Sequence, residues 1–205
     1  MSQSDTDKKP DDKQYFTSNI VHFDRDMPHA NGAIHYPIHP STQYTYRDVG
    51  ELIDVFQGKS KGNSPYSRQG TPTTAVLEAK LAEVEGGDGA VAFATGMAAI
   101  TASFLTLLKS GDHIVVSKYL FGNTSSFFNT LEDLGIQVTR VDASSVANVA
   151  SKIKDNTRIV FVETVANPGT QVPDLLAIGE LCEMHKIIYF VDNTILSPYL
   201  FRPKD

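Results

Sequence analysis

The chain has 205 residues, with 18 Lys or Arg against 24 Asp or Glu, so its formal net charge is −6. This acidic balance argues against sequence-independent nucleic-acid binding, which requires a basic excess. A chain of this length buries about 70% of its unfolded surface and suits one domain, or one domain with an arm. Cys182 is the only cysteine, which excludes a disulfide framework and a cysteine-rich zinc site and favours a reducing, cytoplasmic setting.

The first part of the chain is polar and then becomes rich in proline and aromatic residues. Residues 1–14 combine low hydrophobicity with mixed charge, so we expect a disordered tail. We expect neither a signal peptide nor a membrane span, because no apolar stretch approaches the roughly 18 residues that a span needs. Residues 15–65 are expected to form an extended arm with one short helix, which Asp48 and Glu51 cap and which ends at Gly58.

From residue 66 to 205, helical patterns and short apolar runs alternate. Helices are expected over residues 73–85, 97–109, 124–134, 145–154 and 174–186. Strands are expected over residues 90–94, 114–117, 137–141, 158–162 and 187–191. Continuous apolar strands separated by helix-length segments indicate an α/β domain, with a mostly parallel sheet covered by helices on both faces. Ligands of such sheets bind at the carboxyl ends of the strands.

Polar residues and a glycine follow several of these strands. Gly96 opens a helix directly after a strand, where free N–H groups suit an anion and the missing side chain lets a ligand approach. Asn167 follows Glu163 at the end of a later strand, and Asp192 ends the strand after that. These features predict an anion cradle beside a carboxylate that attracts a cationic group. Each of them is also common as a purely structural feature.

Three further features bear on which ligands the chain can bind. Arg68 is a candidate for a bidentate contact with phosphate, although an ordinary surface arginine is the favoured interpretation if the residue stands alone. His35 and His39 are not expected to bind a metal, because Pro37 lies between them and no helix face presents both. A nicotinamide site is disfavoured because no GxGxxG fingerprint opens the first strand–helix turn.

Four motifs in this order resemble the Cys/Met-metabolism family of pyridoxal-phosphate enzymes, which includes cystathionine γ-synthase, cystathionine lyases, methionine γ-lyase and O-acylhomoserine sulfhydrylases. The motifs are Tyr66-Ser67-Arg68 with Pro72-Thr73, Thr95-Gly96-Met97-Ala98-Ala99-Ile100, Glu163-Thr164 with Asn167-Pro168, and Val191-Asp192-Asn193-Thr194. The resemblance covers roughly residues 15–203. It implies an aminotransferase-like, fold-type I large domain, truncated and preceded by the arm, with pyridoxal 5'-phosphate as cofactor.

The resemblance also implies which residues bind the phosphate. Gly96 and Met97 would bind it through their backbone N–H groups. Tyr66 and Arg68 would reach the phosphate of a neighbouring subunit's cofactor. The expected assembly is therefore a homodimer or homotetramer whose active sites are shared between subunits.

Three other residues are matched to the cofactor ring. Asp192 would face the pyridine nitrogen, where a carboxylate favours the protonated ring that serves as an electron sink. Asn167 would bond to the ring hydroxyl. Phe121 stands where the family usually has Tyr, so the resemblance implies stacking on the ring without the hydroxyl.

The end of the sequence departs from the family pattern. The family's Schiff-base lysine lies in a Ser-x-Thr-Lys segment beyond Asp-Asn-Thr, and Lys204 is too close to Asp192 to be this residue. We therefore expect the chain to correspond to the N-terminal half of such an enzyme, acting by β/γ-elimination or γ-replacement on the amino acids cystathionine, methionine or O-acylhomoserine. The alternative is a non-catalytic fragment that dimerises or binds the cofactor weakly.

Overall fold

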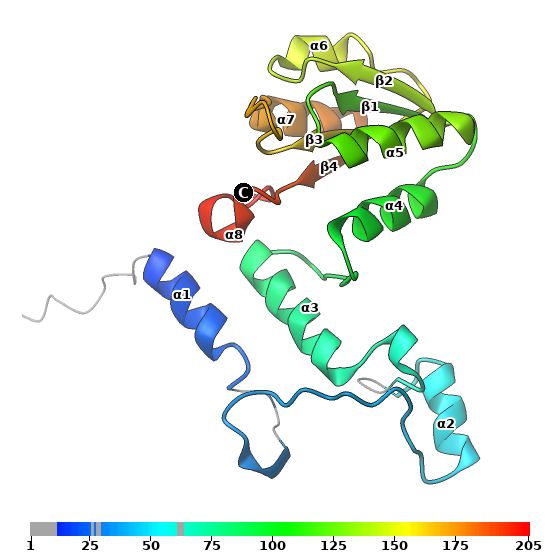
Figure 1. The fold of residues 1–205 in the computed structure, drawn as a ribbon, viewed down its shortest axis with the longest axis vertical. Helices are drawn as coiled ribbons and strands as arrows, with labels where there is room; N and C mark the ends of the chain where they lie inside the picture. Colours follow the sequence, from blue (N-terminus) through cyan, green and yellow to red (C-terminus); the bar gives the residue numbers. More distant parts are fainter. Residues whose placement is uncertain (1–11, 26, 28–29, 61–63) are drawn as a thin grey trace, which may run out of the picture. The chain divides into compact units, whose positions relative to one another are not determined.

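The chain forms two compact units, residues 1–92 and 93–205, which are described separately. The computed structural model describes residues 12–25, 27, 30–60 and 64–205. The expected disordered tail lies outside the described residues, except for its last three positions. The helical elements of the first unit are α1 (Asp12–His22), η1 (Ala30–Gly32), α2 (Val49–Phe56), η2 (Ser67–Gln69) and α3 (Pro72–Glu85), shown in Figure 1.

The first unit contains more helix than the sequence indicated. Helix α1 occupies the end of the expected tail and the start of the expected arm. Sequence periodicity does not indicate α1, because its apolar residues are spread around the helix and form no single stripe. Helix α2 begins as expected: Asp48 Oδ1 accepts the N–H of Glu51 at 2.9 Å, and Glu51 Oε2 accepts the N–H of Arg47 at 2.8 Å.

The second unit contains a sheet of four parallel strands in the order β2-β1-β3-β4. A helix connects each strand to the next along the chain (Figure 1). The elements of this unit are α4 (Gly96–Leu107), β1 (His113–Ser117), α5 (Gly122–Asp133), β2 (Gln137–Val141), α6 (Val146–Ala150), β3 (Thr157–Glu163), α7 (Leu175–His185), β4 (Ile188–Asp192) and α8 (Ser197–Leu200).

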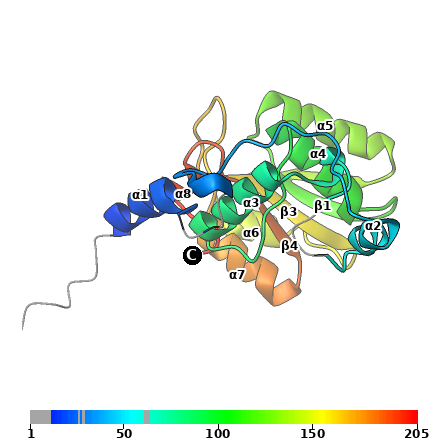
Figure 2. The ribbon, with the colours of Figure 1, turned by 90° about the horizontal axis from the view of Figure 1, so that it is seen from below.

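Helices cover both faces of the sheet, which confirms the α/β fold class. Helices α4 and α5 lie on one face and α6 and α7 on the other (Figure 2). Alternate strand residues supply the two cores, since Ile114 and Val116 join Phe104 of α4, whereas Val115 joins Ile178 of α7. The sheet is therefore buried on both sides, as its continuous apolar strands predicted.

One expected strand is absent. Residues 90–94 have no regular secondary structure, although they form an apolar run. A strand requires a hydrogen-bonded neighbour, and none of the strands that the structure describes pairs with this segment. The boundary between the two units falls within the same run.

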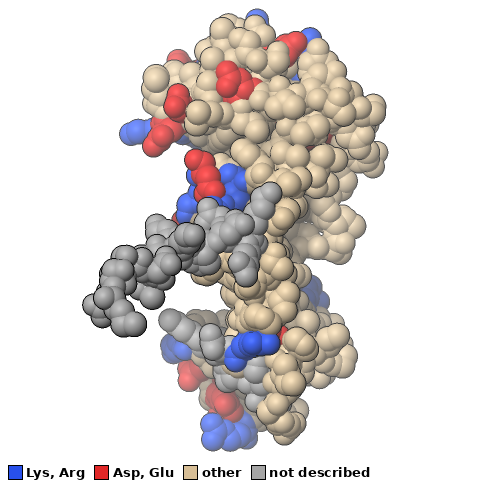
Figure 3. All heavy atoms as spheres, turned by 90° about the vertical axis from the view of Figure 1, so that its left-hand side faces the viewer, with Lys and Arg blue, Asp and Glu red and all other residues tan. Residues whose placement is uncertain are grey.

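On the face of the molecule in Figure 3, basic and acidic side chains lie interspersed among a larger number of other residues. Across the described ranges, no helix is both long enough and apolar enough to cross a bilayer.

Candidate functional site

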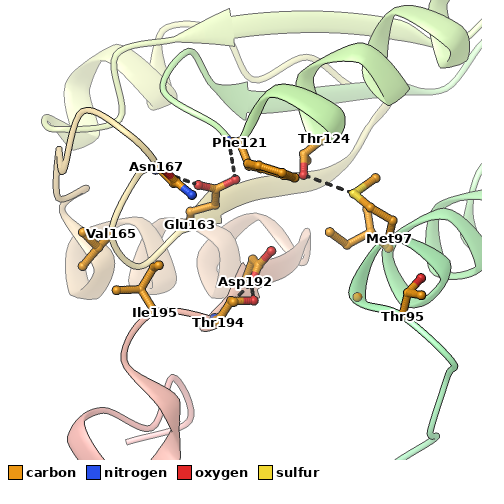
Figure 4. Close-up of a pocket in the computed structure, with 12 residues that line it drawn as sticks. Thr95, Met97, Phe121, Thr124, Glu163, Val165, Asn167, Asp192, Thr194 and Ile195 are labelled. Carbon is orange, nitrogen blue, oxygen red and sulfur yellow. Dashed lines mark hydrogen bonds between the residues drawn. The ribbon is translucent and has the colours of Figure 1, made fainter.

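A pocket of about 330 Å³ lies at the carboxyl ends of β3 and β4, beside the first turns of α4 and α5 (Figure 4). It belongs entirely to the second unit. This is the edge of the sheet at which parallel α/β folds bind ligands. The lining residues are Thr95, Gly96, Met97, Ile100, Phe121, Thr124, Glu163, Val165, Asn167, Asp192, Thr194 and Ile195.

The first turn of α4 offers backbone N–H groups to the pocket. Thr95 is the N-cap, and its Oγ1 accepts the N–H of Ala98 at 3.0 Å. Gly96 and Met97 are the two helix residues before Ala98. Within the described residues, neither of their N–H groups has an assigned acceptor. A Cβ at Gly96 would meet no atom within 4 Å. The helix start is therefore open to an anionic group.

The first turn of α5 lies against that of α4. Thr124 is almost fully buried, and its hydroxyl donates to Met97 Sδ at 3.7 Å. Phe121 is the N-cap residue of α5, with no side-chain capping bond, and 43% of the residue is exposed. Figure 4 shows the Phe121 ring beside Thr124, among the side chains that face the pocket. This ring offers an apolar surface on which a planar ligand can stack.

Glu163, the last residue of β3, is a buried carboxylate beside the pocket, with an exposed fraction of 6%. Its Oε1 accepts the N–H of Phe121 at 2.8 Å and its Oε2 accepts the N–H of Asn167 at 3.4 Å. Burial raises the pKa of Glu163, the two backbone hydrogen bonds oppose that rise, and the charge of Asp192 adds to it. The carboxylate therefore links the β3 end to two other segments of the pocket.

Asp192 ends β4 directly opposite Glu163 in the parallel register. Its backbone carbonyl accepts the N–H of Thr164 at 3.0 Å, which fixes the two strand ends together. Its Oδ1 accepts both the N–H of Thr194, at 3.0 Å, and the Thr194 hydroxyl. The local turn thus holds the carboxylate in one orientation at the pocket.

The structure brings together five of the seven residues expected at the site. Gly96, Met97, Phe121, Asn167 and Asp192 all line the pocket. Their individual binding roles stay predictions.

The other two expected site residues, Tyr66 and Arg68, belong to the first unit. There the Arg68 guanidinium carbon lies 4.7 Å from the centroid of the Tyr66 ring. The two side chains therefore form a cation–π pair.

Sequence reasoning missed part of the lining. Thr124 follows Phe121 by three residues, so the helical repeat of α5 places both on the same side, and this spacing could have identified it. Ile195 carries no comparable signal, because its position depends on the turn after β4. The hydrogen bond between Glu163 and Phe121 uses the backbone N–H of Phe121. Because every residue except proline has such a group, the sequence gives no indication of this bond.

Comparison with known proteins identifies what this arrangement resembles. Residues 17–205 match the model of a family described as Cys/Met metabolism PLP-dependent enzyme. The chain is 35% identical over 190 residues to an L-methionine gamma-lyase of Pseudomonas deceptionensis, an alignment that covers 92% of this chain and 47% of that protein.

Two solved structures give the same result. A cystathionine gamma synthase from Xanthomonas oryzae pv. oryzae, solved with cystathionine, matches with a TM-score of 0.83 and 30% identity, covering 93% of this chain and 47% of its own. A Campylobacter jejuni protein, solved with N'-pyridoxyl-lysine-5'-monophosphate, matches with a TM-score of 0.79 and 32% identity, covering 84% and 42%.

The chain thus spans about half the length of the relatives that it matches. The expected family and its fold-type I architecture are nevertheless confirmed over almost the whole chain. The chain belongs to the Cys/Met-metabolism family of pyridoxal-phosphate-dependent enzymes.

Proposed function

We propose that the pocket of the second unit binds pyridoxal 5'-phosphate. We propose further that the whole protein is a cytoplasmic enzyme that eliminates or replaces the β- or γ-substituent of cystathionine, methionine or an O-acylhomoserine. The observation that carries the proposal is the convergence of two open N–H groups, an aromatic ring and a carboxylate around one pocket. Family membership supports the same cofactor.

The phosphate is expected at the start of α4. The N–H groups of Gly96 and Met97 are the donors that remain once Thr95 has capped the helix. They point from the positive end of the helix dipole, which favours a negatively charged group. The space over Gly96 leaves room for phosphate oxygens to approach the backbone.

The ring is expected between Phe121 and the polar groups at the strand ends. Phe121 offers a stacking face, Asp192 a carboxylate for the pyridine nitrogen, and Asn167 an amide for the ring hydroxyl. When bound, pyridoxal phosphate supplies an electron sink that stabilises negative charge at the substrate's Cα. The carboxylate of Asp192 supports that function by holding a proton on the ring nitrogen.

Assembly is part of the proposal. The pairing of Arg68 with Tyr66 holds the guanidinium near an aromatic ring, and a guanidinium presents a fork of N–H donors that suits a phosphate. We propose that this pair contacts the cofactor phosphate of a neighbouring subunit in a homodimer or homotetramer.

The alternative function is reversible cofactor binding without turnover. It is favoured for this chain alone, because the residues that line the pocket include no lysine.

Binding is tested with pyridoxamine 5'-phosphate, which forms no imine with lysine and so reports the non-covalent site. We expect saturable binding, competition by inorganic phosphate and no binding of NAD at the same concentrations. The reaction is tested separately by incubating the whole protein, loaded with pyridoxal phosphate, with methionine, cystathionine and O-acetylhomoserine and measuring keto acid and thiol release. Absence of saturable binding to the chain would refute the proposal for the pocket.

A further inference from the structure

Glu163 connects two pocket segments that are distant in sequence. Its two carboxylate oxygens accept separate backbone N–H groups, from Phe121 at 2.8 Å and from Asn167 at 3.4 Å. Phe121 lies 42 residues away in the chain, whereas Asn167 lies four away. One buried side chain therefore fixes the start of α5 and the loop after β3 to the same strand end.

Placing a carboxylate at this strand end is energetically unfavourable unless its hydrogen bonds compensate. Glu163 is 6% exposed and stands opposite Asp192 in the parallel register, where adjacent strands lie about 4.8 Å apart. Burial and a second acidic side chain both disfavour its charge. A carboxylate, however, has two acceptor oxygens and no donor, so each oxygen can accept a different N–H group, whereas a glutamine side chain offers only one acceptor oxygen.

The contact with Phe121 bears directly on the aromatic ring. Phe121 is the N-cap residue of α5, and no side-chain bond caps that helix. Only two side-chain torsions separate its backbone from its ring, so fixing the backbone restricts where the ring can lie. The same carboxylate holds the backbone of Asn167, whose side chain also lines the pocket.

We propose that Glu163 is a positioning residue for the cofactor ring, acting through the backbone of Phe121 and, to a lesser extent, of Asn167. The proposal rests on the proposed function, because it concerns the pyridoxal-phosphate pocket. It predicts that Glu163, although it lines the pocket, affects the affinity and orientation of the bound ring through these backbone contacts.

The decisive variant is Glu163→Gln, with Glu180→Gln on α7 as the exposed control. Glutamine has the same shape but one acceptor oxygen, so one of the two N–H groups must face an NH₂ group. We expect the affinity for pyridoxamine 5'-phosphate to fall about tenfold in Glu163→Gln and to stay unchanged in Glu180→Gln. The circular dichroism induced in the bound probe should change in Glu163→Gln alone.

A double-mutant cycle shows whether the effect passes through Phe121. In a Phe121→Ala background, Glu163→Gln should weaken probe binding by no more than about twofold, because the ring that it positions is gone. A full tenfold effect in that background would overturn the proposal, as would unchanged affinity in Glu163→Gln alone. A wild-type chain that fails to bind the probe refutes the proposed function instead, so the two failures are distinguishable.

Amide hydrogen exchange tests the contacts themselves, without the probe. In the wild-type chain both the Phe121 and Asn167 amides should exchange slowly, and in Glu163→Gln one of them should exchange about tenfold faster. Glu163→Asp keeps the charge but is one methylene shorter, so it should lose protection at one amide as well. Fast exchange at both amides of the wild-type chain would overturn the proposal even if neither variant folds.

Discussion

Asp192 presents its two carboxylate oxygens differently. Oδ1 accepts the N–H and the hydroxyl of Thr194, whereas Oδ2 has no assigned hydrogen-bond partner within the described ranges. The Thr194 turn therefore fixes the carboxylate while leaving one oxygen for a ligand. A protonated ring nitrogen would donate to that oxygen in a charge-assisted bond, which is stronger than a neutral one.

Replacing Asp192 with Asn tests this arrangement. The amide keeps the shape and can still accept from Thr194, but it lacks the negative charge. We expect affinity for pyridoxamine 5'-phosphate to fall about tenfold or more, with little change in the thermal midpoint of unfolding. Fluorescence titration measures the affinity, and Asp133→Asn, an exposed position outside the pocket, is the matched control. Equal affinities in both variants would contradict the role given to Asp192.

His113, which begins β1, couples stability to pH. Its ring is fully buried, with Nδ1 2.7 Å from the Thr157 hydroxyl and Nε2 2.8 Å from that of Thr139. Burial lowers the pKa of His113, and the charge of Lys154 adds to the effect. The unfolded chain therefore binds a proton more readily than the folded one. Above about pH 6.5 the His113 ring is neutral in both states and does not reduce the free energy of unfolding. As the pH falls below that value, the unfolded chain takes up the proton first and the free energy of unfolding decreases.

Urea unfolding between pH 7.5 and pH 5.5 measures this coupling. The wild-type free energy of unfolding should decrease over this range by more than that of His113→Gln, which cannot take up the proton. His185→Gln, at the exposed end of α7, should keep the wild-type slope. If His113→Gln and the wild type lose stability in parallel, the buried ring is not the source of the pH dependence.

The sequence predicts single helices and strands correctly where the local residue pattern agrees with the packing of that segment in the folded chain. The strand over residues 137–141 has the bounds expected from its pattern, and the other three paired strands differ from theirs by at most a residue at either end. Residues 90–94 differ from the prediction because an apolar run does not show whether a neighbouring strand is available to pair with it, and Val91 and Phe93 are in fact exposed. Helix α1 was missed because it lacks an apolar stripe.

The caps of α3 and α4 offer a controlled test at the element scale. Thr71 and Thr95 each accept, through Oγ1, the N–H three residues later at 3.0 Å, but only Thr95 lines the pocket. We expect Thr71→Ala and Thr95→Ala each to lower the free energy of unfolding by about 1 kcal/mol. Only Thr95→Ala should also weaken binding of pyridoxamine 5'-phosphate, because it loosens the turn that carries the Gly96 and Met97 amides.

Chemical denaturation and probe titration on the same two variants separate the two effects. Equal loss of probe affinity in both would show that binding follows overall stability. It would then not depend on the first turn of α4.

For the molecule as a whole, much of the site follows from one topological rule. Parallel strands end at the same edge, so a sequence that gives β3 and β4 as neighbours already places Glu163 beside Asp192. Strand order itself is not contained in the apolar pattern, and the link from Glu163 to the Phe121 backbone depends on that order. The sequence alone therefore identifies Glu163 and Asp192 as candidate site residues. Their hydrogen-bond partners can be identified only from the folded structure.

The lining of the pocket leads to an expectation for the 205-residue chain by itself. No lysine lines the pocket, so the contacts proposed for the phosphate and the ring can form there, but a covalent imine with pyridoxal phosphate cannot. Incubation with pyridoxal phosphate followed by borohydride should give scattered, substoichiometric adducts in the intact mass, and methionine should not be turned over. Binding of pyridoxamine 5'-phosphate in parallel should be saturable and reversible by dilution, because the cradle at Gly96 and the carboxylate of Asp192 need no lysine. A stoichiometric adduct mapped to one lysine, together with release of thiol from methionine, would show that this chain completes its own active site.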